Sequence, residues 1–239
     1  MKYLNVDCTS VICSFLDINK YTYVLDSFSL HEKEKDRVLN YWKNHSKYTI
    51  KETTEGKEWN RNGILHRDGG LPAIEYANGT KKWHVNGELH RKGGLPAIEY
   101  ADGWKEWWMD GKLHREGGLP AIEGVNVTKY WYVNNKLHRD CGLPAIEEAN
   151  GTKEWFTNGK RYREGGLPTI EYANGTKNWH VNGKLHREAG LPAIEQANGT
   201  KEWWVNGKRH REGGLPAVEW SDGDKEWWVN GQMVIKNGG

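Results

Sequence analysis

A histidine followed directly by an arginine is the pair in this sequence best equipped for chemistry. The six copies are His66-Arg67, His90-Arg91, His114-Arg115, His138-Arg139, His186-Arg187 and His210-Arg211. Histidine binds metals and transfers protons near neutral pH. However, no second histidine or cysteine stands near any pair at zinc-ligand spacing, and Tyr162 replaces the histidine in one further copy. We therefore predict no metal site and no cofactor.

A structural role suits the pair better, because a glutamate recurs with it. The glutamates are Glu75, Glu99, Glu123, Glu147, Glu171, Glu195 and Glu219. We expect each histidine to form a hydrogen bond with a neighbouring turn and each arginine to pair with a glutamate. A bidentate row of such pairs can fix the register of a sheet.

The other residues give no catalytic signature. No nucleophile–base pair, phosphate-binding loop or paired-carboxylate arrangement is evident, and serine is scarce after residue 57. Asn-Gly-Thr occurs at 78–80, 150–152, 174–176 and 198–200 and is formally a glycosylation acceptor, but turn formation explains it equally well. We predict that the protein is not an enzyme and has no catalytic residues.

A row of variable aromatic residues is the candidate partner-binding site. It consists of His84, Trp108, Tyr132, Phe156, His180, Trp204 and Trp228, each directly after a periodic tryptophan. Neighbouring residues of a strand point to opposite faces. Rows of surface aromatics occur in protein interfaces and in sites that stack sugars or single-stranded nucleic acid. Alternatively, the row completes a second packing layer.

These residues are positioned by a repeat of 24 residues. Lysine begins each unit, Leu-Pro recurs at one position, and tryptophan recurs at Trp59, Trp83, Trp107, Trp131, Trp155, Trp179, Trp203 and Trp227. Seven full units cover 57–224 and a half unit covers 225–239. Strict self-similarity at such a period predicts one supersecondary unit stacked on the next. We expect the periodic tryptophans to pack between repeats, against proline, aliphatic side chains and the lysine stem.

Two Asn-Gly or Asp-Gly pairs in each unit predict tight turns, such as Asn78-Gly79 and Asn86-Gly87. In hairpin turns of this kind both residues need positive φ. Asn135, which replaces one glycine, tolerates that conformation. Val127 does not, because it is β-branched, so we expect the loop 124–127 to take another shape.

Such turns reverse the chain, so we predict antiparallel pairing. One unit is expected to contain a strand at 81–85, a strand that starts at Glu88 and is bent or bulged at Gly93-Gly94, and an extended segment at 95–101. The predicted fold is mainly β: an elongated antiparallel β-meander, a single twisted sheet of hairpins, with a small N-terminal α-helical segment. About two strands per unit at ~4.8 Å would advance the array ~10 Å per unit.

The recurring Trp-x-x-Asn-Gly-x-x-His-x-x-Gly pattern resembles the MORN family, over residues 57–239. The unit here is one residue longer, has arginine after the histidine, and carries Gly-Leu-Pro-Ala-Ile-Glu. It is closer to MORN-like arrays of large DNA viruses and phages. The resemblance implies side-by-side hairpins and a scaffold role, with lipid binding proposed for some members.

Residues 1–50 lack the repeat and have apolar residues at helical spacing. Leu4-Asn5-Val6-Asp7 and the stretch 11–18 resemble a divergent F-box, which implies docking to a Skp1-type adaptor of a cullin ubiquitin ligase through Leu4, Ile12, Phe15 and Leu16. Asn5 stands where that family usually has proline. A helical cap on the first repeat, or another docking module, is an alternative.

Composition limits the partners. The net charge of +2 gives no strong nucleic-acid signal, and three cysteines form no disulfide framework. No signal peptide or membrane span is evident. We expect a cytoplasmic protein that is not secreted, in the host-cell cytoplasm if viral, and a non-enzymatic scaffold whose array binds a target. The alternatives are a structural rod or virion-associated scaffold that self-associates through its C-terminal sheet edge, and a carbohydrate or single-stranded nucleic-acid binder using Trp108, Trp204 and Trp228.

Overall fold

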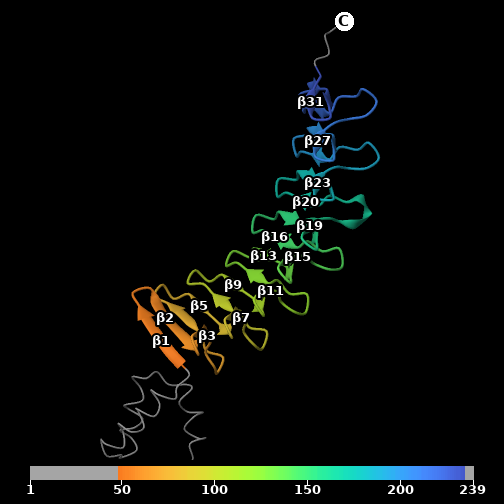
Figure 1. The fold of residues 1–239 in the computed structure, drawn as a ribbon. Helices are drawn as coiled ribbons and strands as arrows, with labels where there is room; N and C mark the ends of the chain where they lie inside the picture. Colours follow the sequence, from red (N-terminus) through yellow and green to blue (C-terminus); the bar gives the residue numbers. More distant parts are fainter. Residues whose placement is uncertain (1–47, 235–239) are drawn as a thin grey trace, which may run out of the picture. The chain divides into compact units, whose positions relative to one another are not determined.

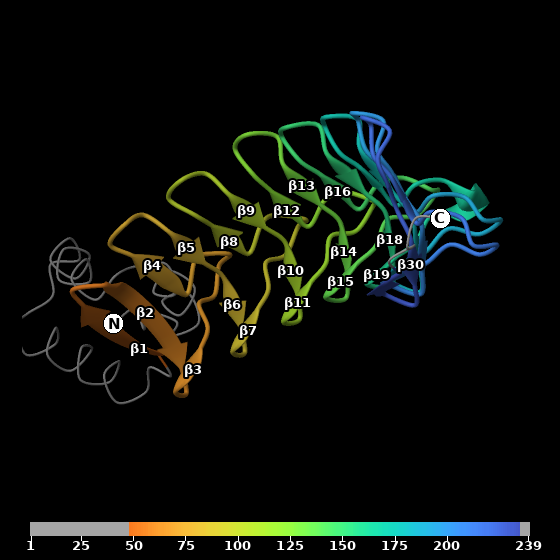
Figure 2. The same cartoon turned by 90° about the horizontal axis from the view of Figure 1, so that it is seen from above.

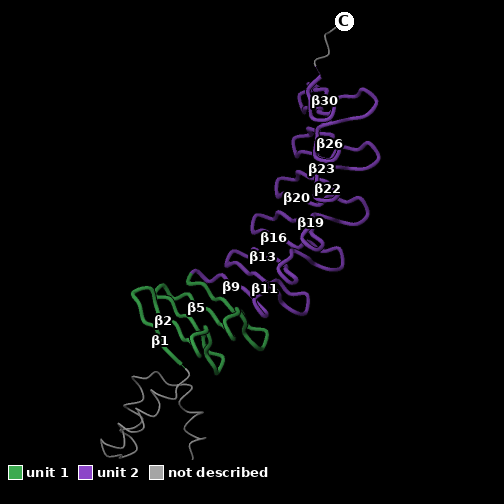
Figure 3. Tube along the Cα trace, viewed as in Figure 1, with its two compact units in different colours: residues 1–101 green, residues 102–239 purple. Residues whose placement is uncertain are grey.

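The structure is a computed structural model that describes residues 48–234. Regular structure in this range is almost entirely β, with one short 3-10 turn, η1 (Glu164–Gly166). The chain divides into two compact units, residues 1–101 and 102–239, each of which is taken by itself below (Figure 3). The predicted helical segment and its adaptor-docking residues, Leu4, Ile12, Phe15 and Leu16, lie outside the described residues.

Unit 1 contains a ladder of antiparallel strands followed by a small hairpin. The strands are β1 (Tyr48–Thr53), β2 (Gly56–Arg61), β3 (Ile64–Leu65), β4 (Ile74–Tyr76), β5 (Lys81–Lys82), β6 (His84–Val85), β7 (Glu88–Leu89) and β8 (Ile98–Glu99). The ladder β1–β2–β4–β5–β8 follows chain order, β3 also pairs with β2, and β6 pairs with β7. Strand β1, which precedes the predicted array, was not recognised in the sequence.

Unit 2 repeats the same arrangement. Its main ladder consists of β9 (Lys105–Glu106), β12 (Ile122–Glu123), β13 (Lys129–Tyr130), β16 (Ile146–Glu147), β17 (Lys153–Glu154), β20 (Ile170–Glu171), β21 (Lys177–Asn178), β24 (Ile194–Glu195), β25 (Lys201–Glu202), β28 (Val218–Glu219) and β29 (Lys225–Glu226). Each strand pairs antiparallel with the next one in this order. The predicted antiparallel meander is therefore confirmed, with two ladder strands per repeat (Figure 1).

Each repeat of unit 2 also forms a separate two-stranded hairpin. The pairs are β10 (Trp108–Met109) with β11 (Lys112–Leu113), β14 (Tyr132–Val133) with β15 (Lys136–Leu137), β18 (Phe156–Thr157) with β19 (Lys160–Arg161), β22 (His180–Val181) with β23 (Lys184–Leu185), β26 (Trp204–Val205) with β27 (Lys208–Arg209), and β30 (Trp228–Val229) with β31 (Gln232–Met233). Their positions beside the ladder can be followed in Figure 2.

The periodic tryptophan is the point where the chain passes from the ladder to the hairpin. The backbone nitrogen of Trp83 donates to the carbonyl of Ala97, directly before β8 of the ladder, at 2.8 Å, while its carbonyl accepts from the backbone nitrogen of His90, directly after β7 of the hairpin, at 3.1 Å. The predicted strand 81–85 is thus divided at Trp83 into β5 and β6. Because the two halves pair with different segments, one backbone builds both the sheet and the hairpin.

The hairpin turns confirm the predicted Asn-Gly geometry. Asn86 has φ of 51° and Gly87 has φ of 88°, as a two-residue turn that matches the strand twist requires. At the position where glycine is missing, Asn135 adopts φ of 65°. Asparagine is among the few residues that tolerate this region, because its short polar side chain can form local hydrogen bonds.

The second turn of each unit differs from the prediction. At Asn78-Gly79 only the glycine has positive φ, 94°, while the Asn78 side chain accepts a hydrogen bond from the Thr80 backbone nitrogen. The expectation of another shape at 124–127 was wrong. Gly124 donates to the Thr128 carbonyl at 2.8 Å, as Tyr76 does to Thr80, and Val127 occupies the glycine position with φ of 64°. Backbone bonding retains the turn despite the strain at valine.

The Gly-Gly pair forms a turn rather than a bulge within a strand. Gly93 and Gly94 both have positive φ, 78° and 68°, and they lie between β7 and β8. We call the segments 66–72, 90–96, 114–120, 138–144, 162–168, 186–192 and 210–216 the Gly-Leu loops. The Gly-Leu loops of unit 2 project one after another from one side of the unit. They can be found in Figure 1 from the short turquoise coil of η1, which lies in one of them. Their turns return the chain from the hairpin to the ladder.

Candidate functional site

Each repeat contains a compact group built from tryptophan, arginine, glutamate and a proline carbonyl. In one repeat the guanidinium carbon of Arg91 lies 3.7 Å from the ring centroid of Trp83. Arg91 Nη1 donates to Glu99 Oε1 at 2.7 Å and to the Pro96 carbonyl at 3.1 Å. The predicted arginine–glutamate pairing is confirmed, although one nitrogen makes both bonds and the pairing is not bidentate. The arginine that stacks on the tryptophan was not predicted, and the lysine cover on the ring stays a prediction.

The periodic tryptophans Trp59, Trp83, Trp107, Trp131, Trp155, Trp179 and Trp203 are buried, and Trp227 is half-buried. Indole N–H groups connect neighbouring repeats: Trp83 Nε1 donates to the Gly70 carbonyl at 2.8 Å, and Trp131, Trp155, Trp179, Trp203 and Trp227 make the equivalent bond to the preceding Gly-Leu loop. The Gly-Leu loops are therefore fixed by the next repeat.

Histidines provide a second connection, as predicted. His66 Nδ1 accepts a hydrogen bond from the backbone nitrogen of Asn86, in the turn of the next repeat, at 3.0 Å. His138, His186 and His210 accept equivalent bonds. Each of these four histidines also places Nε2 near a carboxylate two residues later. Both ring nitrogens of these histidines therefore have partners, which is a structural role.

The predicted aromatic row lies along the hairpins and is only partly open. Phe156 is 9% exposed and belongs to an apolar core with Trp131, Ala145 and Ile146, while the other six members are half-buried. The indole nitrogens of Trp108, Trp204 and Trp228 donate to the carboxylates of Glu106, Glu202 and Glu226. These bonds fix the orientation of the three indoles.

The structure brings Trp204 and Trp228 together around one arginine. The Arg209 guanidinium lies 5.2 Å from the Trp204 ring and 5.1 Å from the Trp228 ring. It also donates to Glu202, a buried carboxylate that accepts from Gln196 as well. The buried charge of Glu202 is therefore compensated, as such a group requires.

Burial changes the acid–base behaviour of the two histidines in the row. Burial, helped by the positive charge of Arg161, lowers the pKa of His180 to about 4, and its Nδ1 lies 2.7 Å from the hydroxyl of Thr169. Burial also lowers the pKa of His84, against the opposing effect of a bond to the Gly87 carbonyl. Both rings are neutral near pH 7.

One feature was not anticipated from the sequence: the leucine of every Gly-Leu loop except the first, which carries the half-buried Leu71, is open to solvent. In unit 2 these are Leu119, Leu143, Leu167, Leu191 and Leu215, each between 47% and 50% exposed, whereas the prolines that follow are buried. The sequence feature that could have indicated these leucines is the Leu-Pro pair at one position of every repeat. It was not used because an apolar residue at a repeat position is ordinarily assigned to the core. These leucines are more exposed than the aromatic row.

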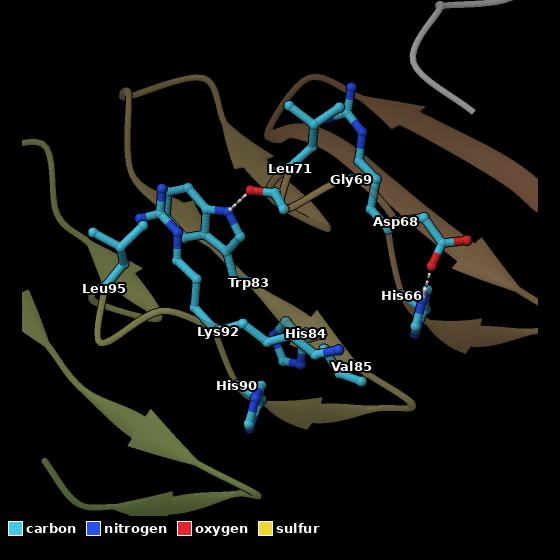
Figure 4. Close-up of a pocket in the computed structure, with 13 residues that line it drawn as sticks. His66, Asp68, Gly69, Leu71, Trp83, His84, Val85, His90, Lys92 and Leu95 are labelled. Atoms are coloured by element: carbon cyan, nitrogen blue, oxygen red, sulfur yellow. Dashed lines mark hydrogen bonds and ion pairs between the residues drawn. The ribbon is translucent and has the colours of Figure 1, made fainter. Parts of the chain in front are cut away.

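A shallow pocket of 210 Å³ lies between consecutive Gly-Leu loops of unit 1. Leu71 and Leu95 stand on the two loops and Trp83 lies between them, while Val85 of β6 lines the pocket beside His84 (Figure 4). In unit 2 a pocket of 190 Å³ is lined by Leu215, Trp227 and Val229. The two pockets use the same repeat positions, 144 residues apart in the sequence.

Between residues 48 and 234 no group of three or more histidine, cysteine, aspartate or glutamate side chains is arranged to hold a metal ion. In the same range no helix has the length and hydropathy needed to cross a membrane. Cys141, a free and exposed cysteine, lies at a loop position that is glycine in most repeats.

Comparison of the chain with protein-family models, with curated proteins and with solved structures gives no match.

Proposed function

We propose that the protein is a non-enzymatic interaction scaffold whose repeat array binds a protein target. The observation that supports this most directly is the set of inter-repeat hydrogen bonds made by tryptophan and histidine, which holds equivalent surface loops at regular positions. Preorganised surfaces lose less conformational entropy when they bind. The proposal includes kinship with MORN-like arrays and a cytoplasmic location, in the host cell if the protein is viral.

The array part is tested by capture from cell extract on the immobilised full-length chain. We expect a partner to be retained in stoichiometric amount and to be released by excess free chain. If no retained protein is released by excess free chain, the scaffold role is contradicted.

The second part of the proposal is that residues 1–50 dock to a Skp1-type adaptor through Leu4, Ile12, Phe15 and Leu16. An array that holds a target close to a ubiquitin-conjugating complex raises the effective concentration of the target at that complex. Full-length protein should bind the adaptor, and Phe15→Ala should abolish binding while leaving the unfolding midpoint of the array unchanged. If the wild-type chain does not bind the adaptor, this part falls and the array proposal stands.

A second candidate function, self-association as a rod, is favoured by the end of unit 2. Among the described strands β29 pairs only with β28, and Val229, Met233 and Val234 are 48%, 54% and 42% exposed. Exposed edge strands promote association. Sedimentation should show mass increasing with concentration and reversed by Met233→Lys, and a strict monomer at high concentration would reject the rod.

A further inference from the structure

The Gly-Leu loops and the hairpins together border a repeated apolar site. Both pockets are lined by a loop leucine and by a residue from the first hairpin strand of the next repeat, Leu71 with Val85 in unit 1 and Leu215 with Val229 in unit 2. In unit 2 the corresponding hairpin residues are Met109, Val133, Thr157, Val181, Val205 and Val229. A loop leucine and a hairpin residue at these positions recur through unit 2, and the hairpin residue is apolar in every repeat except at Thr157.

The loop wall carries negative charge. Glu116, Asp140, Glu164, Glu188 and Glu212 each precede a loop leucine by three residues, and all are exposed. The side chains of Asp140, Glu188 and Glu212 are 85%, 81% and 90% exposed. The arginines of the loops do not cancel this charge, because they are paired with the ladder glutamates.

The hairpin wall carries positive charge at the same spacing. Met109 is directly opposite Lys112 and Val133 is directly opposite Lys136, so each pair shares one face of its hairpin. The lysines of this row are Lys112, Lys136, Lys160, Lys184 and Lys208, all exposed. A segment lying between the walls would thus meet carboxylates on one flank and ammonium groups on the other.

The spacing of the sites restricts the conformation of such a segment. Two ladder strands per repeat advance the sites by about 10 Å. Seven residues of an α-helix rise about 10.5 Å, which returns a side chain to nearly the same face. Successive side chains of an extended strand alternate between faces and do not match this period. Three residues of a polyproline II segment rise about 9.3 Å and also return to one face, so a proline-rich peptide is the competitor that the test includes.

We infer that the Gly-Leu loops and hairpins of unit 2 bind an amphipathic α-helix of a partner protein, with one large apolar residue per heptad between consecutive loop leucines. The basic flank of the helix faces the loop carboxylates, and its acidic flank faces the hairpin lysines. This inference rests on the proposed scaffold function and names the surface and the class of partner.

The test uses full-length protein and a fluorescent 35-residue helical peptide. Each heptad carries leucine at the first position and alanine at the fourth, to limit coiled-coil pairing, with lysine on one flank and glutamate on the other. We expect saturable binding by anisotropy and increased peptide helicity. Leu143→Ser/Leu167→Ser/Leu191→Ser should raise Kd at least about 30-fold, since three apolar contacts are lost.

The controls distinguish binding between the Gly-Leu loops and the hairpins from nonspecific hydrophobic binding. Val125→Ser removes a 65% exposed apolar side chain from a sheet turn and should leave Kd unchanged. Glu164→Lys/Glu188→Lys should weaken the original peptide and favour one with glutamate on both flanks, because the hairpin lysines are unchanged. Because the leucines are half-exposed, the triple variant should keep the wild-type unfolding midpoint. If it does not, the single variant Leu167→Ser provides a milder check.

Several outcomes would overturn the inference: no binding of the helical peptide, equal binding by the triple leucine variant, or tighter binding of a proline-rich peptide of the same charge. Self-association of the wild type that the triple variant abolishes would instead assign the surface to a second copy. If extract capture succeeds while the peptide test fails, the scaffold proposal survives and the helix-binding surface does not. Failure of capture removes the parent proposal as well.

Discussion

The indole nitrogen of Trp155 donates a hydrogen bond of 2.9 Å to the carbonyl oxygen of Gly142, in the preceding repeat. The same ring is covered by Arg163, at 3.7 Å. One side chain thus couples two repeats and organises its own. Arrays of this type derive much of their stability from interfaces between neighbours.

Trp155→Phe should keep most of the buried ring and lose the hydrogen bond to Gly142. We expect the free energy of unfolding to fall by about 1–2 kcal/mol, because a partly buried carbonyl loses its donor. Denaturant unfolding of the full chain measures this. Trp228→Phe is the matched control, since its indole bonds to Glu226 of the same repeat and is less buried; an equal loss in both variants would contradict the coupling role.

Arg163→Lys tests whether the guanidinium acts through its shape or only through its charge. Arg163 stacks on Trp155 and donates to Glu171 at 2.6 Å and to the Pro168 carbonyl at 3.0 Å. Lysine keeps the charge but cannot stack a planar group while making both bonds, so stability should fall by about 1 kcal/mol. The free energy of unfolding is measured for both proteins in low and in high salt. A lysine variant as stable as the wild type would show that charge alone suffices.

Val127→Gly should stabilise the protein by about 1 kcal/mol, because valine has φ of 64° where the other repeats have glycine. The nearby Val125→Gly is the control. Val125 is not among the residues with positive φ, so glycine there only adds conformational freedom to the unfolded chain and should destabilise. Thermal unfolding compares the two, and a lower midpoint for Val127→Gly would refute the strain.

His180 should make stability depend on pH. Its pKa is about 4 in the folded chain and near 6.5 when unfolded, so below pH 6.5 the unfolded state takes up the proton first. Stability is therefore full above pH 6.5 and falls between pH 6.5 and 4, by about 1–2 kcal/mol after allowance for solvent screening of a partly exposed ring.

The matched variant for this pH dependence is Thr169→Ala/His180→Phe, which gives the residue types found at these positions in the repeats containing Ala145 and Phe156. It should fold and show a smaller loss of stability between pH 6.5 and 4, measured by denaturant unfolding at each pH. A variant with the same pH profile as the wild type would show that His180 does not cause the effect. His84, whose pKa is also lowered, accounts for part of the remaining slope.

Much of the local structure followed from the sequence. Asn86-Gly87 specified its turn because few residues accept positive φ, and the short reversal required antiparallel neighbours. The bond from the Asn86 backbone to His66 and the pairing of Arg91 with Glu99 were also expected. These predictions succeeded because they depend on backbone preferences and charges that every repeat shares.

Other features were decided only by the tertiary structure. The strand is divided at Trp83, where the backbone changes its pairing partner. The alternation of side chains along one strand therefore could not predict the faces on which Lys81, Trp83 and His84 lie. Val127 was forced into the shape of its neighbours by the ladder on either side. The sequence determined the period, the turns and the antiparallel order. Contacts between residues of different repeats decided that the aromatic row is partly covered and that the loop leucines stay exposed. The reason is that burial is set by the packing of neighbours and not by residue type.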